Sequence, residues 1–212
     1  MKTTTLAIVG LVGLSAMSFA DESKVLDHHW QVRLRATDLV PSDKSDAFSA
    51  LGVNFGANAV HVSPKIIPEI DVDYFFNEKW SAELVLTNPQ RHDVTLAGVG
   101  HIGTLTHLPP SLLAQYHFKV NGLPVDPYVG AGVNFTILSS NLGVGATNLD
   151  LSPNSFGIAY QIGFDYKLNE HWLLNLDYKY INLHANVKAG NAVLTQANVN
   201  PSLFAIGVGY RF

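Results

Sequence analysis

The stretch FGIAYQIGFDYK, residues 156–167, decides the fold because its two faces differ strictly. Large apolar side chains occupy every even position from Phe156 to Tyr166, whereas glycine, alanine or polar residues occupy every odd position. A period of two is typical of a β-strand whose faces meet different surroundings. We therefore predict a strand here, with one wholly apolar face.

The same alternation recurs along the chain and predicts eight strands in all. They cover residues 30–35, 66–74, 80–87, 112–118, 128–137, 156–167, 172–183 and 202–212. Short links rich in turn residues, at 77–79, 119–124 and 169–171, alternate with long links at 38–64, 88–109, 139–154 and 184–201. This arrangement is typical of an up-and-down barrel in a membrane, with the short turns periplasmic. An even number of strands then places both termini on the periplasmic side.

The composition favours a lipid-facing surface. Charged residues make up 14% of the chain, well below the usual quarter. Aromatic residues gather beside the short turns, as in an interfacial girdle: Trp30, Tyr74, Phe76, Trp80, Phe118, Tyr166, Trp172, Tyr210 and Phe212. A secreted soluble barrel of the lipocalin type is the alternative, but it would be charged outside and apolar inside. The predicted fold class is therefore all-β, a transmembrane eight-stranded antiparallel up-and-down β-barrel.

The first twenty residues resemble an export signal rather than part of the barrel. Lys2 precedes the apolar run LAIVGLVGL at 6–14, and Ser18 and Ala20 place small residues at a cleavage site. The run is too short to span a bilayer as a helix. We expect residues 1–20 to be a cleaved signal peptide and residues 21–212 to be a barrel domain in the outer membrane of a Gram-negative bacterium.

Several runs resemble the outer membrane protein W family. They are TLTHLPPSLLAQYHF at 104–118, PYVGAGVNFT at 127–136, GFDY at 163–166, WLLN at 172–175 and the terminal GYRF at 209–212. The first long link and residues 141–153 depart from the family pattern. The resemblance implies an apolar channel for small hydrophobic molecules that leave sideways into the membrane, and some members are bacteriocin receptors. It also implies that Phe212 is read by the barrel-assembly machinery, and that outer-membrane lipid and lipopolysaccharide surround the barrel.

The inward-facing residues change character with height. An ionic plug is expected toward the periplasmic end, where opposite charges in a narrow lumen should pair: Arg33, Arg35, Asp71, Asp73, Glu83, Asp165, Lys167, Asp177 and Arg211. His117 falls at the same height, and Glu69, Gln115, Asn134 and Lys179 fall between the two zones. Apolar residues are expected to line a channel toward the outer end: Leu39, Ile67, Val85, Leu113, Ala159, Ile181, Leu183, Leu203 and Ala205. The plain alternative is that the charges only hold the barrel shut, without transport.

Three prolines mark candidate weak points in the wall, because proline cannot donate to a strand ladder. Pro68 lies on the outward face of the second strand, and Pro109 and Pro110 begin the fourth. They are candidates for a lateral opening. The alternative is that they only kink the strand ends.

Other functions find little support in the sequence. The absence of cysteine excludes thiolate metal sites, and the net charge of −4 gives no basic footprint for nucleic acid. His28 and His29 are neighbours that point to opposite faces, and His92, His101 and His107 share one long link, so we predict no metal site and no cofactor. Ser111 near His107 could suggest a lipase, but no Gly-x-Ser-x-Gly motif is present, and we predict no catalytic residue. A receptor or adhesin that acts through its loops, such as residues 185–200, stays open as an alternative function.

Overall fold

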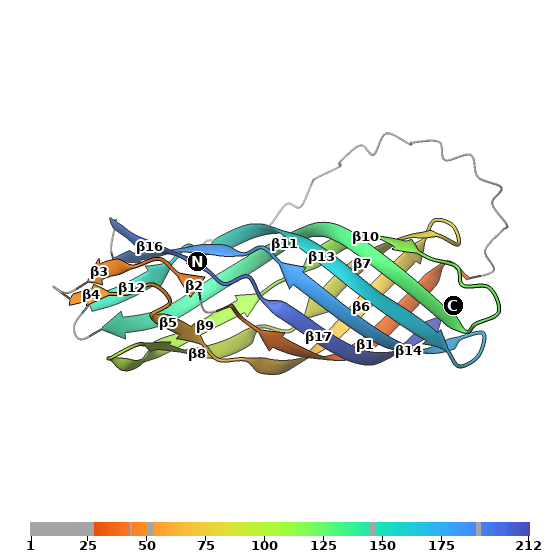
Figure 1. Cartoon of the computed structure of the whole chain (residues 1–212), viewed down its shortest axis with the longest axis horizontal. Coiled ribbons are helices and arrows are strands. Elements are labelled where there is room, and N and C mark those ends of the chain that lie inside the picture. The colour runs from red at the N-terminus through yellow and green to blue at the C-terminus, as the bar shows by residue number, and fades with distance from the viewer. Residues whose placement is uncertain (1–27, 43, 51–52, 145–146, 190–191) are drawn as a thin grey trace, which may run out of the picture.

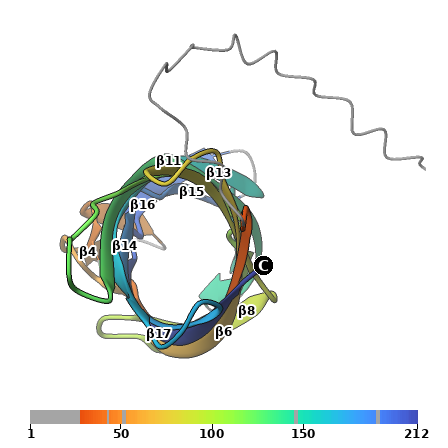
Figure 2. The same ribbon diagram turned by 90° about the vertical axis from the view of Figure 1, so that its right-hand side faces the viewer.

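The computed structural model describes residues 28–42, 44–50, 53–144, 147–189 and 192–212. Eight of its strands form a closed antiparallel ring in the order β10-β7-β6-β1-β17-β14-β13-β11, and β10 pairs with β11 to complete it (Figure 2). These strands are β1 (Trp30–Val40), β6 (Lys65–Phe75), β7 (Trp80–Thr87), β10 (Ser111–His117), β11 (Val125–Val144), β13 (Asn154–Lys167), β14 (Trp172–Ile181) and β17 (Ser202–Arg211). The predicted barrel is confirmed. The predicted signal peptide, residues 1–20, lies outside the described residues.

Alternation along each strand sets the two faces of the wall. On β13 the even residues, such as Phe156 and Ile158, are exposed on the outside, whereas the odd residues Ala159 and Gln161 are buried in the lumen. This arrangement is inverted relative to a soluble barrel, since apolar side chains cover the outer surface. Among the residues described, no helix is long and apolar enough to cross a bilayer.

One end of the barrel, here called the turn end, is closed by tight connections. Asn77 Oδ1 accepts hydrogen bonds from the backbone N–H groups of Lys79 and Trp80, both at 2.9 Å, and Asn169 caps its own turn in the same way. The backbone N–H of Phe212 donates to the carbonyl of Trp30 at 2.8 Å, so the last residue seals the β1–β17 seam. Aromatic rings pack edge to face around this end, for example Trp172 against Tyr210.

The opposite end, here called the hairpin end, differs from the prediction. The four long links are not irregular loops, since they contain strands that continue the wall beyond the barrel (Figure 1). These strands are β2 (Lys44–Ser45), β3 (Phe48–Ala50), β4 (Val53–Phe55), β5 (Val60–Val62), β8 (Gln90–Leu96), β9 (Gly100–Leu108), β12 (Thr147–Leu151), β15 (His184–Ala189) and β16 (Ala192–Asn198). They form what we call the extension. Its outer surface carries the exposed charges Arg91 and Asp93, so it lies beyond the apolar band.

The extension is an open sheet rather than a second closed ring, and β3 and β4 pair with each other in a separate two-stranded sheet. Its order is β5-β8-β9-β11-β12-β15-β16-β2, and in the ladders that the structure describes β5 pairs with β8 and β2 pairs with β16. The chain leaves β1 toward β2 and enters β6 from β5. The two edges of the extension therefore lie above the β1–β6 seam of the barrel.

Candidate functional site: a plugged lumen beneath an apolar chamber

The lower half of the lumen is filled by a network of buried charges centred on Arg33. Its guanidinium contacts both oxygens of Asp73 at 2.7 Å and binds Asp165 with two N–H groups, at 2.7 and 3.2 Å. Asp73 lies on the neighbouring strand β6, whereas Asp165 reaches from β13, which is not a neighbour of β1 in the ring. Arg33 therefore ties two separate parts of the wall together through the lumen, and its side chain is completely buried.

Arg35 continues the network one layer higher. It contacts Asp71 at 2.8 Å and donates to Asn175 at 2.7 Å, and it lies 3.2 Å from Glu69 and from Glu83. Asp71 and Glu69 lie on β6, Glu83 lies on β7 and Asn175 lies on β14, all on the inner face of the wall. Bidentate and charge-assisted contacts of this kind compensate for the high cost of burying a charge.

Lys179 completes the network. Its ammonium group donates to Glu69 at 2.7 Å and to Asp177 at 2.8 Å, and Tyr128 donates its hydroxyl to Asp177 at 2.8 Å. Among these buried ionic groups, three are basic and six are acidic. The plug therefore holds more carboxyl groups than basic groups.

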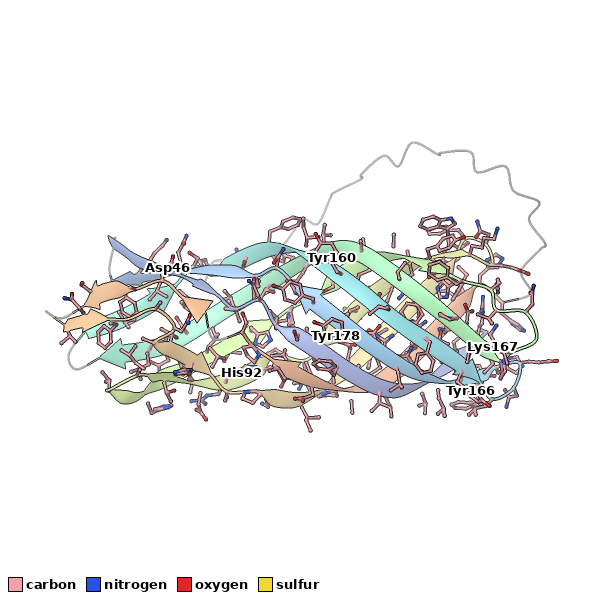
Figure 3. All side chains as sticks on the ribbon, viewed as in Figure 1. Asp46, His92, Tyr160, Tyr166, Lys167 and Tyr178 are labelled. Atoms are coloured by element: carbon pink, nitrogen blue, oxygen red, sulfur yellow. The ribbon has the colours of Figure 1, made fainter. Side chains whose placement is uncertain are left out.

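The structure brings most of the predicted plug residues together but not all of them. Arg33, Arg35, Asp71, Asp73, Glu83, Asp165 and Asp177 are all in the network. Lys167 and Arg211 are not: Lys167 is 42% exposed and lies 3.7 Å from Asp126 at the turn end, and Arg211 lies over the ring of Phe75. Both follow inward alternation, but they sit too near the mouth of the barrel to reach the central acids. Figure 3 shows Lys167 at the turn end, far from His92.

Two members of the network, Glu69 and Lys179, were placed between the two zones in the sequence analysis. Glu69 lies directly opposite Arg35 in the β1–β6 ladder, and Lys179 contacts Asp177, which is two residues away on β14. Inward alternation predicts that both residues face the lumen, but it does not show which groups they contact there.

An apolar layer rests on the plug. Leu39, Ile67, Val85, Leu113, Ala159, Ile181, Leu183 and Leu203 are all buried and form a single cluster. These are the residues that alternation and height placed toward the outer end, and the fold brings them together. Ala205 is buried as well, outside this cluster. Above this layer the extension contributes a second cluster, which the sequence analysis missed because it assigned these segments to loops: Ala59, Val94, Leu96, Ile102, Leu105, Leu138, Leu142 and Leu149.

Between the two clusters lies a cavity of about 80 Å³, which we call the chamber. This volume has room for roughly six water-sized groups. Leu39, Ile181, Leu183 and Leu203 form its floor, and Leu105, Leu138 and other residues of the extension form its wall. Almost all of its lining is apolar, so it suits a small apolar molecule better than water.

Two histidines lie in the chamber wall, although the sequence analysis treated them as loop residues. The rings of His92 and His107 are stacked with centroids 4.8 Å apart, and both residues are buried. Burial, together with the neighbouring His92 and Lys65, lowers the pKa of His107 to about 4. Burial also lowers the pKa of His92, against the effect of its hydrogen bond to Ser63. Both rings are therefore neutral near pH 7.

This pKa predicts that acid weakens the extension. His107 has a lower pKa when it is buried than the value of 6.5 expected in an open extension. The open state therefore binds more protons, so stability is complete above pH 6.5, falls as the pH drops toward 4, and is then lower by about 3 kcal/mol. Amide exchange of β8 and β9, corrected for intrinsic rates, should rise from pH 7 to pH 4.5, and His107→Phe should reduce the increase, with His92 accounting for the remainder. Equal increases in both proteins would contradict the assignment.

The remaining candidate sites do not assemble. His28 contacts the ring of His171 and His29 stacks on Tyr74, and no group of three potential metal ligands exists among the described residues. The hydroxyl of Ser111 donates to the carbonyl of Pro109 at 3.4 Å and accepts from Asn134 at 2.9 Å. These contacts support a structural role for Ser111 at the junction of barrel and extension.

The wall is interrupted near the prolines. The β6–β7 ladder begins at Glu69 and the β5–β8 ladder ends at Val62, so Lys65 to Pro68 lie between two described ladders on this side. The bonds that bridge this window are made by side chains: Thr87 to the carbonyl of Pro68 at 2.8 Å, and Lys65 to the carbonyl of Arg91 at 3.4 Å. At Pro109 and Pro110, in contrast, Asn134 donates to both carbonyls at 3.2 Å. The segment at Pro109 and Pro110 is therefore held to β11 by hydrogen bonds.

Comparison with known proteins places these features in context. The sequence model described as the OmpW family matches residues 28–212. The outer membrane protein W of Vibrio cholerae serotype O1 is 33% identical, and the alignment covers all of both chains. The crystal structure of OprG from Pseudomonas aeruginosa is similar, with a TM-score of 0.72, 27% identity, and coverage of 87% of this chain and 96% of that one. A dibenzothiophene metabolism operon protein, PahQ of Pseudomonas aeruginosa, is 25% identical over the whole of both chains.

Proposed function

This chain belongs to the OmpW family, and on that premise we propose that it admits small hydrophobic molecules through the outer membrane. The observation that carries the proposal is the apolar chamber above a closed ionic plug. A solute in the chamber would gain roughly 25 cal/mol for each Å² of apolar surface that it buries. The apolar lining makes a charged group costly to bury, so neutral solutes are the best match. One relative is named for an operon of dibenzothiophene metabolism, and this name agrees with an apolar solute.

The orientation follows from the two ends. Short turns and both ends of the described chain share the turn end, which we propose is periplasmic, and the extension then faces outward. The chamber would fill from outside. Because Arg33, Arg35 and Lys179 close the lumen below it, we propose that the solute leaves through the wall.

The chamber can be tested by a pair of substitutions that match in shape. Leu105→Gln with Leu138→Gln places polar groups in the wall, whereas Leu105→Met with Leu138→Met keeps it apolar. We expect uptake of toluene into cells that depend on this barrel to fall about tenfold in the glutamine variant, the factor for about 1.4 kcal/mol of lost binding. The methionine variant should resemble the wild type. Equal uptake in both variants, at equal amounts of folded barrel, would reject the chamber as the route.

The window beside Pro68 is the proposed exit. Its bridging bonds are few, and Ile66 on its outer surface is 72% exposed. Pro68→Val restores a backbone donor at this position and should tighten the wall. We expect solute uptake to slow severalfold while binding in the chamber is unchanged. Pro110→Val serves as the control, since the break at that position is already bound by Asn134. Unchanged uptake in Pro68→Val would argue against this exit and leave the chamber standing.

This function requires that the barrel lie in the outer membrane, in contact with lipid and lipopolysaccharide. It also requires that the assembly machinery insert the barrel there, which we propose involves Phe212. A receptor role for the extension, including recognition of a bacteriocin, is the second candidate. The observation that favours it is the exposed outer surface of β8, with Arg91 and Asp93. Loss of surface binding without loss of uptake, on exchanging these charges for serine, would support that role.

A further inference from the structure

One polar atom in the chamber wall has no partner. His92 is 1% exposed, and its Nε2 is buried without a hydrogen-bond partner. The other ring nitrogen, Nδ1, lies 2.6 Å from the carbonyl oxygen of Ser63. A carbonyl can only accept, so in the neutral ring Nδ1 must carry the hydrogen. Nε2 is therefore a bare acceptor.

His92 belongs to the lining of the chamber and lies on the inner face of β8. His92 follows the inward alternation of β8, between the inward residues Gln90 and Val94. Its Nδ1 is held by the wall at Ser63, and Nε2 belongs to the distal edge of the ring, away from the backbone. The stacked ring of His107 covers one face of His92 and limits its rotation.

The rest of the chamber offers no substitute partner. Its lining is apolar apart from His92, His107 and Thr136, and Thr136 already donates to Asn134 at 2.6 Å. A buried acceptor that stays unpaired is unfavourable, because nothing compensates for the water that it has lost. Such a group in an otherwise apolar cavity commonly fixes the orientation of a ligand.

We propose that the chamber selects small apolar molecules that carry one neutral hydroxyl or N–H donor, which binds Nε2 of His92. This inference rests on the proposed function and names the class of its solute. The apolar lining makes a charged carboxylate costly to bury, and the apolar floor requires that the rest of the molecule be hydrocarbon. An aromatic or short aliphatic alcohol fits both conditions.

Phenol and toluene provide a matched test, because they share shape and size and differ by one donor. Binding of each to the folded barrel in lipid nanodiscs would be measured for the wild type and for His92→Phe, and corrected against empty nanodiscs. We expect the ratio of phenol to toluene affinity to fall about fivefold in His92→Phe, in the range for one hydrogen bond. His101→Phe, on the exposed face of β9, should leave the ratio unchanged.

A second readout does not depend on a variant. In the wild type, phenol should shift the imidazole ¹⁵N resonance of His92 Nε2, and toluene should leave it in place. If both solutes bind and neither the ratio nor the resonance responds to the donor, the chamber is a simple apolar site and the role of His92 is rejected, while the proposed function survives. A water held on Nε2 would give this result. If neither solute binds the wild type, the proposed function fails together with this inference.

Discussion

Replacing Arg33 with methionine should lower the free energy of unfolding by about 3–5 kcal/mol, the usual cost of breaking a buried ion pair. The reason is the charge that remains. Arg33 faces Asp73, Asp165 and Glu83, and all three carboxylates are buried. Methionine would fill similar space but would leave these acids without their main partner. Urea unfolding in lipid vesicles, followed by the barrel's tryptophan fluorescence, would measure the loss.

Lys167→Met is the matched control, because Lys167 is also predicted to face inward but lies partly exposed at the turn end. We expect its cost to stay below about 1 kcal/mol, as for an exposed ion pair. Adding Asp73→Asn and Asp165→Asn to Arg33→Met should recover part of the stability by removing two of the stranded charges. If Arg33→Met and Lys167→Met lowered the free energy of unfolding by the same amount, the buried charge network would not be a main source of the barrel's stability.

The second large effect is expected at Gly132, on the inner face of β11. A Cβ at this position would overlap the carbonyl oxygen of Leu112 and the Cα of Leu113 on the neighbouring strand β10. Backbone atoms within a ladder cannot rotate away, so β10 and β11 would have to separate. We expect Gly132→Ala to cost about 3 kcal/mol, at the upper end for overpacking.

Gly130→Ala is the control for Gly132, since it makes the same change two residues away on the same face. There the nearest atom is Oε1 of Gln161, at 2.6 Å from the added Cβ, and a side chain can move. We expect a cost near 1 kcal/mol. The two variants would be compared by the fraction that refolds into vesicles and by urea unfolding. A larger effect at Gly130 than at Gly132 would contradict the packing described here.

The first prediction concerns the closed lower lumen, and this closure shapes the function that we propose. A barrel of eight strands leaves little space beyond its side chains. In this chain ionic groups fill that space in the middle of the barrel, and the chamber lies above them, where the extension adds a second layer of wall. The solute site therefore depends on the extension as much as on the barrel.

The sequence alone determined the faces of the strands and the class of the fold. Strict alternation in residues 156–167 and its recurrence in seven further segments were enough to predict a lipid-facing barrel, and the family resemblance agreed. Alternation with height also grouped the eight residues of the apolar layer correctly. These features depend on local periodicity and on strand direction, and both can be read along the chain.

The tertiary structure alone decided which groups meet across the lumen. Arg33 and Asp165 are separated by 132 positions and lie on strands that do not pair, so no local pattern could join them. His92 and His107 lie on the paired strands β8 and β9, but their stacking depends on the register of that pair, which alternation does not set. The strands of the extension complete their wall by pairing with one another and with the upper part of β11. Lys167 and Arg211 were placed in the plug by alternation, and the barrel's geometry leaves them at its mouth. Periodicity fixes the side of the wall on which a residue lies, but closure of the ring fixes its distance from every other inward residue.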